Sequence, residues 1–147
     1  IDPRGPQVAA ALTSVVLVAV LLLAPGALGV VLLAAQAVVF AIGATRGVQH
    51  TPYSWVFRTF VRPRLGAPAE LEDPAPPRFA QDVGLVISIV GVIGYATGAT
   101  ALGLAAAAAG VLAAFLNGVF GLCLGCEMYL IIRRIWPGRA ITGAGRI

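Results

Sequence analysis

The sequence has no lysine and few charged residues of any kind, since ten arginines and six acidic residues make up only 11% of its 147 positions. Soluble domains normally have about a quarter of their residues charged. Apolar residues make up 59% of the chain, and its mean hydropathy is +0.94. These values exclude an ordinary soluble domain. The only long polar segment, residues 46–82, is too short for a separate catalytic domain.

Metal and cofactor ligands are also scarce. Two cysteines and one histidine are too few for a zinc site with four protein ligands, unless carboxylates join them or chains combine. One histidine and one methionine fit haem ligation poorly, so we expect no cofactor. A net charge of +4 made entirely by arginine favours anchoring at a membrane surface over nucleic-acid binding. The expected partner is therefore the lipid bilayer.

Two long runs without a charged residue dominate the sequence. The first has 41 residues between Arg4 and Arg46, and the second has 44 between Asp82 and Glu127. A membrane-spanning helix needs about 20 apolar residues, so each run can hold two. Glycine, proline or threonine near the middle of each run predicts a tight turn. The sequence thus predicts an all-α integral membrane protein with four transmembrane helices, near residues 7–23, 27–45, 82–96 and from 101 to 116 or beyond. Asn117-Gly118 is expected to end or bend the fourth helix.

The arginines predict the orientation of these helices. With four spans, the N-terminus, the central loop and the C-terminus share one side, and the two turns share the other. All ten arginines fall in the first three segments. The positive-inside rule then places both termini in the cytoplasm, at the bacterial inner membrane. A secretory signal is the alternative for the first run; it is disfavoured because this run has a counterpart in the second half.

The two halves match at an offset of 74 residues, which aligns Arg4 with Arg78 and Gln7 with Gln81. Further matches are Pro3 with Pro77, Ser14 with Ser88, Gly47 with Gly121 and Pro63 with Pro137. This shared register indicates a duplication, with chance likeness of alanine-rich hairpins as the alternative. We expect one membrane domain over residues 1–147, built from parallel hairpin repeats that a pseudo-two-fold axis relates. The repeats cover residues 3–63 and 77–137, and a linker covers 64–76.

Each repeat ends in a segment that we expect to form a short helix in the headgroup layer. In residues 47–63, Thr51 suits the N-cap and Pro52 the first helical position. Aromatic and arginine side chains in this segment suit the membrane interface. The equivalent segment of the second repeat, 121–137, carries a Cys-x-x-Cys motif, which the alignment places at the start of its helix.

Cys123 and Cys126 of this motif are the candidate catalytic residues. Their spacing at a helix start lets the sulfurs meet, so that one thiolate attacks a substrate and the other resolves the mixed disulfide. A helix N-terminus favours the thiolate, whereas burial opposes it, and the sequence leaves the balance open. We expect Cys123 to attack and Cys126 to resolve. The alternative is that both cysteines only pack as small apolar residues. In the cytoplasm any bridge between them would be transient.

Glu127 and His50 complete the predicted site. Glu127 is the one acidic residue beside a membrane-embedded run, where a carboxylate is costly without a function or a partner. It would either shuttle protons for the thiols or pair with an arginine. His50 aligns with Leu124, between the positions equivalent to the cysteines, and would face the thiols across the pseudo-axis. The alternative for His50 is a simple polar residue at the interface.

Several motifs carry a resemblance to a known family. They are Asp2-Pro3-Arg4-Gly5-Pro6, His50-Thr51-Pro52-Tyr53, Phe57-Arg58, Val61-Arg62-Pro63-Arg64, Asn117-Gly118 and Gly121-x-Cys123-x-x-Cys126-x-x-Tyr129. Over essentially its whole length, the chain resembles an uncharacterised bacterial membrane family, a domain of unknown function common in high-GC Gram-positive bacteria. Its members are often encoded beside thioredoxin-like and sulfurtransferase proteins, which implies thiol or sulfur traffic. Residues 121–129 are also similar to rhodanese-linked inner-membrane proteins, which usually carry a single Cys-Pro instead.

Three functions are compatible with these observations. The first is a cytoplasm-facing membrane thiol protein that exchanges disulfides, or relays sulfane sulfur, with a thioredoxin-like or sulfurtransferase partner. The second is a carrier or pore for a sulfur species or a soft metal ion. A pore would need a homodimer, for which Gly84-x-x-x-Ser88 and Gly94-x-x-x-Gly98 offer close-packing faces. The third is a structural anchor that docks a soluble enzyme through its arginines. Whether the protein is an enzyme stays open.

Overall fold

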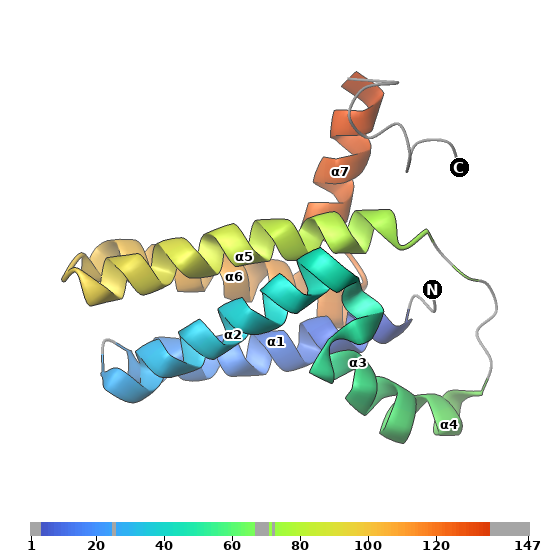
Figure 1. Cartoon of the computed structure of the whole chain (residues 1–147), viewed down its shortest axis with the longest axis horizontal. Coiled ribbons are helices and arrows are strands. Elements are labelled where there is room, and N and C mark those ends of the chain that lie inside the picture. Colours follow the sequence, from blue (N-terminus) through green and yellow to red (C-terminus); the bar gives the residue numbers. More distant parts are fainter. Residues whose placement is uncertain (1–3, 25, 67–70, 72, 136–147) are drawn as a thin grey trace.

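The computed structural model describes residues 4–24, 26–66, 71 and 73–135, and every regular element in those ranges is a helix (Figure 1). Four helices of 20 to 22 residues are long and apolar enough to cross a membrane. They are α1 (Arg4–Leu23), α2 (Ala27–Arg46), α5 (Ala75–Ala96) and α6 (Thr100–Phe120). The all-helical class is therefore confirmed, and the two uncharged runs hold four helices able to cross a membrane, as predicted. Residues 3 and 137, the outer ends of the two proposed repeats, lie outside the described residues.

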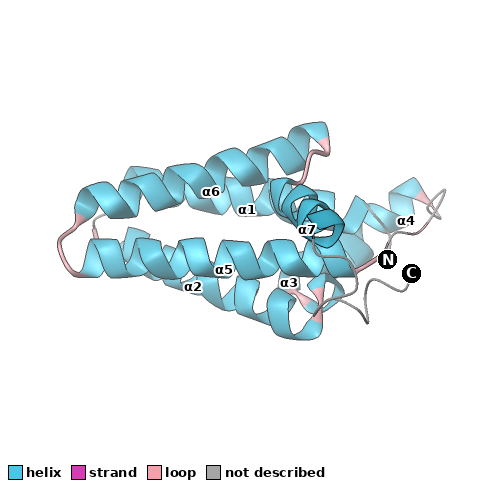
Figure 2. Ribbon diagram, turned by 90° about the horizontal axis from the view of Figure 1, so that it is seen from above, coloured by secondary structure: helices cyan, strands magenta, loops and turns pink. Residues whose placement is uncertain are grey.

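The four long helices form one bundle. The most extensive interfaces are α1 with α6 and α2 with α5. Figure 2 shows that α5 and α6 meet at their shared turn and spread apart toward the other end, where α7 (Leu124–Ile135) lies across them. The turns after α1 and after α5 share one end of the bundle, and the short helices gather at the opposite end (Figure 1).

The packing of the bundle relies on small residues. A Cβ atom on Gly118 of α6 would lie 2.9 Å from the Cα of Ala11 on α1, and one on Gly94 would lie 2.7 Å from the backbone nitrogen of Gly103. A Cβ on Gly84 would meet the ring of Phe40. Such close approach is typical of helix interfaces in membranes. Because these contacts lie within one chain, they occupy faces that the sequence had suggested for a dimer.

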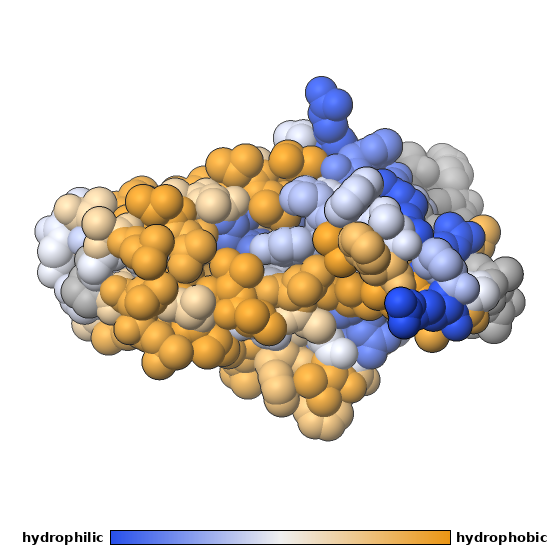
Figure 3. Space-filling model, turned by 90° about the horizontal axis from the view of Figure 1, so that it is seen from below, coloured by the Kyte–Doolittle hydropathy of each residue, from blue (hydrophilic) through white to orange (hydrophobic). Residues whose placement is uncertain are grey.

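Large apolar side chains cover the outside of the bundle. Val15, Leu22, Leu28, Leu112 and Phe115 are among many that are exposed on the four long helices. Figure 3 shows that apolar residues cover most of the long part of the molecule, whereas hydrophilic residues gather at the end that holds the short helices. Helices that are apolar on nearly every face are typical of membrane spans. This surface therefore suits contact with lipid.

The start of α5 differs from the prediction. The helix begins at Ala75, seven residues before the expected start at residue 82. Pro76 and Pro77 fall in its first turn, where a backbone N–H has no intrahelical partner and proline is tolerated. The Asp73 carboxylate accepts a hydrogen bond from the Ala75 N–H at 3.0 Å and supports this start. The prediction was wrong because it started the helix with the uncharged run that follows Asp82 and assigned Pro76 to the linker.

The end of α6 also differs from the prediction. Asn117 and Gly118, which were expected to end or bend this helix, lie inside it. The helix continues to Phe120 and ends at Gly121, whose φ of 72° is a conformation that glycine adopts without strain. Gly118 serves the close contact with α1 and does not interrupt the helix.

The segment after α2 forms a chain of short helices. The predicted N-cap is confirmed, because the Thr51 hydroxyl accepts a hydrogen bond from the Ser54 N–H at 3.3 Å. A π turn precedes Pro63 and accommodates a residue that cannot donate a backbone hydrogen bond. In order, the elements are the 3-10 helix η1 (Val48–His50), α3 (Pro52–Val56), the π helix η2 (Phe57–Val61) and α4 (Arg62–Leu65).

Candidate functional site

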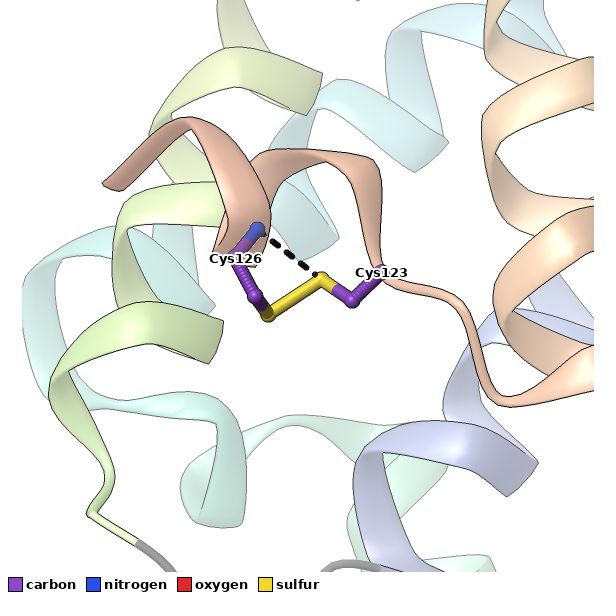
Figure 4. The surroundings of a disulfide bond; sticks show 2 residues. All are labelled: Cys123 and Cys126. Atoms are coloured by element: carbon purple, nitrogen blue, oxygen red, sulfur yellow. Dashed lines mark hydrogen bonds between the residues drawn. A yellow bond between two sulfur atoms is a disulfide. The ribbon is translucent and has the colours of Figure 1, made fainter. Parts of the chain in front are cut away.

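Cys123 and Cys126 are joined by a disulfide bond at the start of α7 (Figure 4). Their Cα atoms are 5.2 Å apart. Cys123 directly precedes the helix, and its carbonyl accepts the first helical hydrogen bond from the Glu127 N–H at 3.0 Å. Its sulfur accepts a further hydrogen bond from the Cys126 N–H at 3.1 Å. Cys123 thus caps α7 in the way that a serine or threonine hydroxyl caps other helices.

A tight turn brings the motif to this position. The Gly121 N–H donates to the Asn117 carbonyl at 3.0 Å, and the Leu122 N–H donates to the Leu116 carbonyl at 3.2 Å. These bonds satisfy carbonyls at the end of α6, while the positive φ of Gly121 redirects the chain. Helix α7 therefore leaves the bundle at a steep angle with Cys123 at its base (Figure 1).

Two contacts hold α7 on α5. A Cβ atom on Gly125 would lie 2.6 Å from the Cβ of Ala80, so the helices touch where the disulfide sits. One turn further on, the Tyr129 side chain is 5% exposed, and its ring centre lies 5.7 Å from that of Phe79. The position of the sulfur atoms therefore depends on a small residue in the middle of the Cys-x-x-Cys motif.

A cavity of about 790 Å³ opens between the bundle and α7, and both cysteines line it. Its volume lies within the range of about 300–1,000 Å³ that is usual for small-molecule sites. It extends from the disulfide to Leu17 and Leu33 in the core of the bundle. The lining is mostly apolar, with many alanines of α6. The polar and charged side chains that line it are Gln7, Thr13, Thr51, Tyr53, Asp73, Gln81, Ser88, Asn117 and Glu127.

The structure brings three of the four predicted site residues together. Glu127 lies in the first turn of α7 and lines the same cavity as the two cysteines. His50 lies on η1, is exposed, and does not line this cavity. The segment that follows α2 packs against α1 through α3, whereas α7 packs against α5. The two segments thus lie on different helices, and the structure does not place His50 in the cavity with the thiols.

Apart from Glu127, the polar cavity residues were not identified as site residues from the sequence. The alignment of the two halves could have pointed to them, because it pairs Gln7 with Gln81 and Ser14 with Ser88. Gln7 donates a hydrogen bond to the Gly118 carbonyl at 3.3 Å, and Gln81 packs against Gly43. Within the part of the chain that the structure describes, no three side chains of His, Cys, Asp or Glu lie close enough to hold a metal ion.

Tyr53 connects the cavity wall to a buried amide. Its hydroxyl donates a hydrogen bond to the Gln36 side-chain oxygen at 2.6 Å, and Gln36 is only 1% exposed. Burial raises the pKa of Tyr53, so this hydroxyl keeps its proton and remains a donor. Tyr53 is itself a lining residue, so this bond fixes one side of the cavity.

Comparison with known proteins agrees with the resemblance seen in the sequence. No curated protein and no solved structure matches the chain. A family model matches residues 1–134, which include all four long helices, the Cys-x-x-Cys motif and most of α7. The chain belongs to the family described as "Domain of unknown function (DUF4395)".

Proposed function

We propose that this protein is a membrane thiol protein in which Cys123 and Cys126 alternate between a dithiol and a disulfide. Its redox partner is a soluble thioredoxin-like protein, and a sulfurtransferase could use the same thiols to pass on sulfane sulfur. The observation that carries the proposal is the bonded pair at the start of α7, where both cysteines are partly exposed. Pairs with this spacing at helix starts are suited to reversible thiol–disulfide exchange.

The exchange proceeds through a mixed disulfide. A thiolate of the partner attacks the sulfur of Cys123, the bond between the two cysteines breaks, and Cys126 leaves as a thiolate. The second thiol of the partner then attacks the sulfur of its own first cysteine and releases Cys123. The partner becomes oxidised by two electrons, and the pair in α7 becomes reduced. The same steps in reverse oxidise the pair.

We also propose that the protein lies in the bacterial inner membrane with both termini in the cytoplasm. The distribution of charge supports this orientation. The described arginines all lie away from the two turns that join the long helices, in α1, α2, the segment after α2, α5 and α7. By the positive-inside rule, the end that carries them faces the cytoplasm. The disulfide would then be reachable by cytoplasmic proteins.

A duplicated hairpin is our proposal for the origin of the scaffold. Exchange of the two halves would convert the interface of α1 with α6 into that of α5 with α2, and these are the two most extensive interfaces. The matched residues Gly47 and Gly121 both have positive φ and both follow the second helix of their repeat. The repeats differ in their last segments, since Trp55 is exposed whereas the matched Tyr129 is buried.

Trapping of the mixed disulfide tests the proposed function. The oxidised protein in nanodiscs is mixed with a reduced thioredoxin whose second active-site cysteine is replaced by serine, so that the covalent intermediate accumulates. We expect the adduct with wild-type protein and with Cys126→Ser after thiol activation, and none with Cys123→Ser. If the wild-type protein forms no adduct and its thiols never bridge in maleimide mass-tagging, the proposal fails.

The same preparation separates the other functions considered from the sequence. A carrier would accumulate thiosulfate or copper(I) inside proteoliposomes, and the uptake would depend on the cysteines. An anchor would lose its soluble partner when the arginines at the short-helix end are replaced, whereas cysteine substitutions would leave the complex intact.

A further inference from the structure

The cavity beside the disulfide has a lining that restricts what it can hold. At one end lie Cys123, Cys126 and Glu127, and at the other lie the core residues Leu17 and Leu33. An occupant in contact with the sulfurs would thus extend into the bundle at the depth of the membrane spans. The apolar lining at that depth favours a lipid-soluble ligand.

The occupant must also have polar groups of its own. Thr13 and Ser88 are 6% and 2% exposed, lie inside spanning helices, and line the cavity together with Gln81 and Asn117. Hydroxyl and amide groups in an apolar environment are stabilised only by hydrogen-bonding partners. A purely hydrocarbon occupant, such as a lipid acyl chain, would leave these groups unmatched. A flat ring with carbonyl oxygens would accept hydrogen bonds from them and pack against the alanines of α6.

We propose that this cavity binds a lipid-soluble quinone, which takes two electrons from the cysteine pair. This inference rests on the proposed thiol function and names the oxidant. In the step, the two S–H bonds of the dithiol break and one S–S bond forms between Cys123 and Cys126. The quinone receives two electrons and two protons and becomes the hydroquinone. Glu127, on the wall of the same cavity, is placed to accept a thiol proton and pass it on.

The test uses the full chain in lipid nanodiscs under anaerobic conditions. The protein is reduced with dithiothreitol, which is then removed, and decyl-ubiquinone is added. This benzoquinone is fully substituted, so thiols cannot add to its ring. The hydroquinone is followed by absorbance, and the disulfide by maleimide mass-tagging. We expect one hydroquinone for each disulfide formed, and none with Cys123→Ser.

Two matched substitutions on α6 locate the reaction. Ala113 lines the cavity, whereas Ala108 is exposed on the same helix and does not line it. Ala113→Trp should slow oxidation by the quinone about tenfold or more, a range typical of a change in fit at one pocket position. Ala108→Trp should leave the rate unchanged. Oxidation by a water-soluble aromatic disulfide should proceed equally in both variants and serves as the check that each is folded.

The possible outcomes separate this inference from the function on which it rests. If the thiols exchange with thioredoxin but reduce no quinone, the quinone inference is wrong and the thiol function stands. Equal slowing by the two tryptophans would place the reaction outside the cavity and also overturn the inference. If the thiols neither exchange nor bridge with any reagent, both proposals fall.

Discussion

The sulfur of Cys123 accepts a hydrogen bond from the backbone N–H of Cys126, 3.1 Å away. This geometry distinguishes the two sulfurs, because the Cys123 sulfur receives an N–H at the start of α7, where helix N–H groups favour negative charge. In the dithiol, the same N–H would stabilise a Cys123 thiolate. The structure therefore supports the expectation that Cys123 is the attacking residue.

Alkylation of the reduced protein tests this asymmetry. One hydrogen bond contributes about 1 kcal/mol, which corresponds to roughly a fivefold preference for the Cys123 thiolate. We expect iodoacetamide at neutral pH to react faster with Cys126→Ser, which retains Cys123, than with Cys123→Ser. Equal rates in the two folded variants, or a faster rate for the variant that retains Cys126, would show that Cys123 is not the attacking residue.

Gly125 should be intolerant of larger side chains. Because its position touches Ala80, Gly125→Leu would force α7 away from α5 and displace the sulfurs. Overpacking of this kind typically costs about 1–3 kcal/mol. Thermal unfolding in detergent should detect the loss, and the rate of disulfide formation should fall. Ile131→Leu, at an exposed position of the same helix that does not line the cavity, is the control and should change neither quantity.

Removal of the Tyr53 hydroxyl should destabilise the bundle. Tyr53→Phe leaves the buried Gln36 amide without this partner, and we expect a loss of about 1–2 kcal/mol of unfolding free energy. The double variant with Gln36→Leu should recover much of the loss, because no amide remains to be satisfied. A double variant as unstable as Tyr53→Phe would show that the hydrogen bond is not the cause.

The contribution of Tyr53 should also depend on pH. Burial raises the pKa of Tyr53 above its ordinary value of 10.0, so folding favours the protonated form. The stabilisation is fully present below about pH 10, the value for the unfolded chain, and is lost as pH rises through the raised value. The difference in stability between wild type and Tyr53→Phe should therefore shrink only in strongly alkaline solution. A difference that shrinks already near neutral pH would contradict this origin.

Arg78 ties α5 to the end of α2. Its side chain donates to the Ala44 carbonyl at 2.8 Å and to the Thr45 carbonyl, in the last turn of α2. A cation at this helix end is favourable, and we expect Arg78→Ala to lower the unfolding free energy by about 1–2 kcal/mol. Arg64→Ala, which removes an exposed arginine of α4, is the comparison. If both substitutions lower the unfolding free energy equally, the loss of one positive charge, and not the hydrogen bonds of Arg78, is the cause.

The long helices could be predicted because a helix that crosses a membrane requires about 20 consecutive, mostly apolar residues. The 41 uncharged residues between Arg4 and Arg46 allow little besides two spans and a turn. Helix ends were harder to predict. Proline occurs both in linkers and in the first turn of helices, and Pro76 was assigned to the linker although it lies in the first turn of α5. Gly118 was expected to end or bend α6, although it lies inside the helix and allows the close contact with α1.

The site could be predicted only in part. The start of a helix at the cysteines was predicted from the alignment of the two proposed repeats, and α7 begins at Leu124. The cavity depends on how far α5 and α6 spread, which composition does not determine. The position of His50 could not follow from the repeat alignment either, because the last segments of the two halves pack on different long helices.

A redox titration of the cysteine pair tests the central claim most directly. The full chain in nanodiscs is equilibrated in glutathione buffers for the higher potentials and in dithiothreitol buffers for the lower ones, and its disulfide is measured by maleimide mass-tagging. We predict a single two-electron transition between about −120 and −270 mV, the range of the thioredoxin-like proteins with which the pair would exchange. Thiols that stay reduced at every potential, or a bridge that resists reduction below about −300 mV as structural disulfides do, would contradict the account.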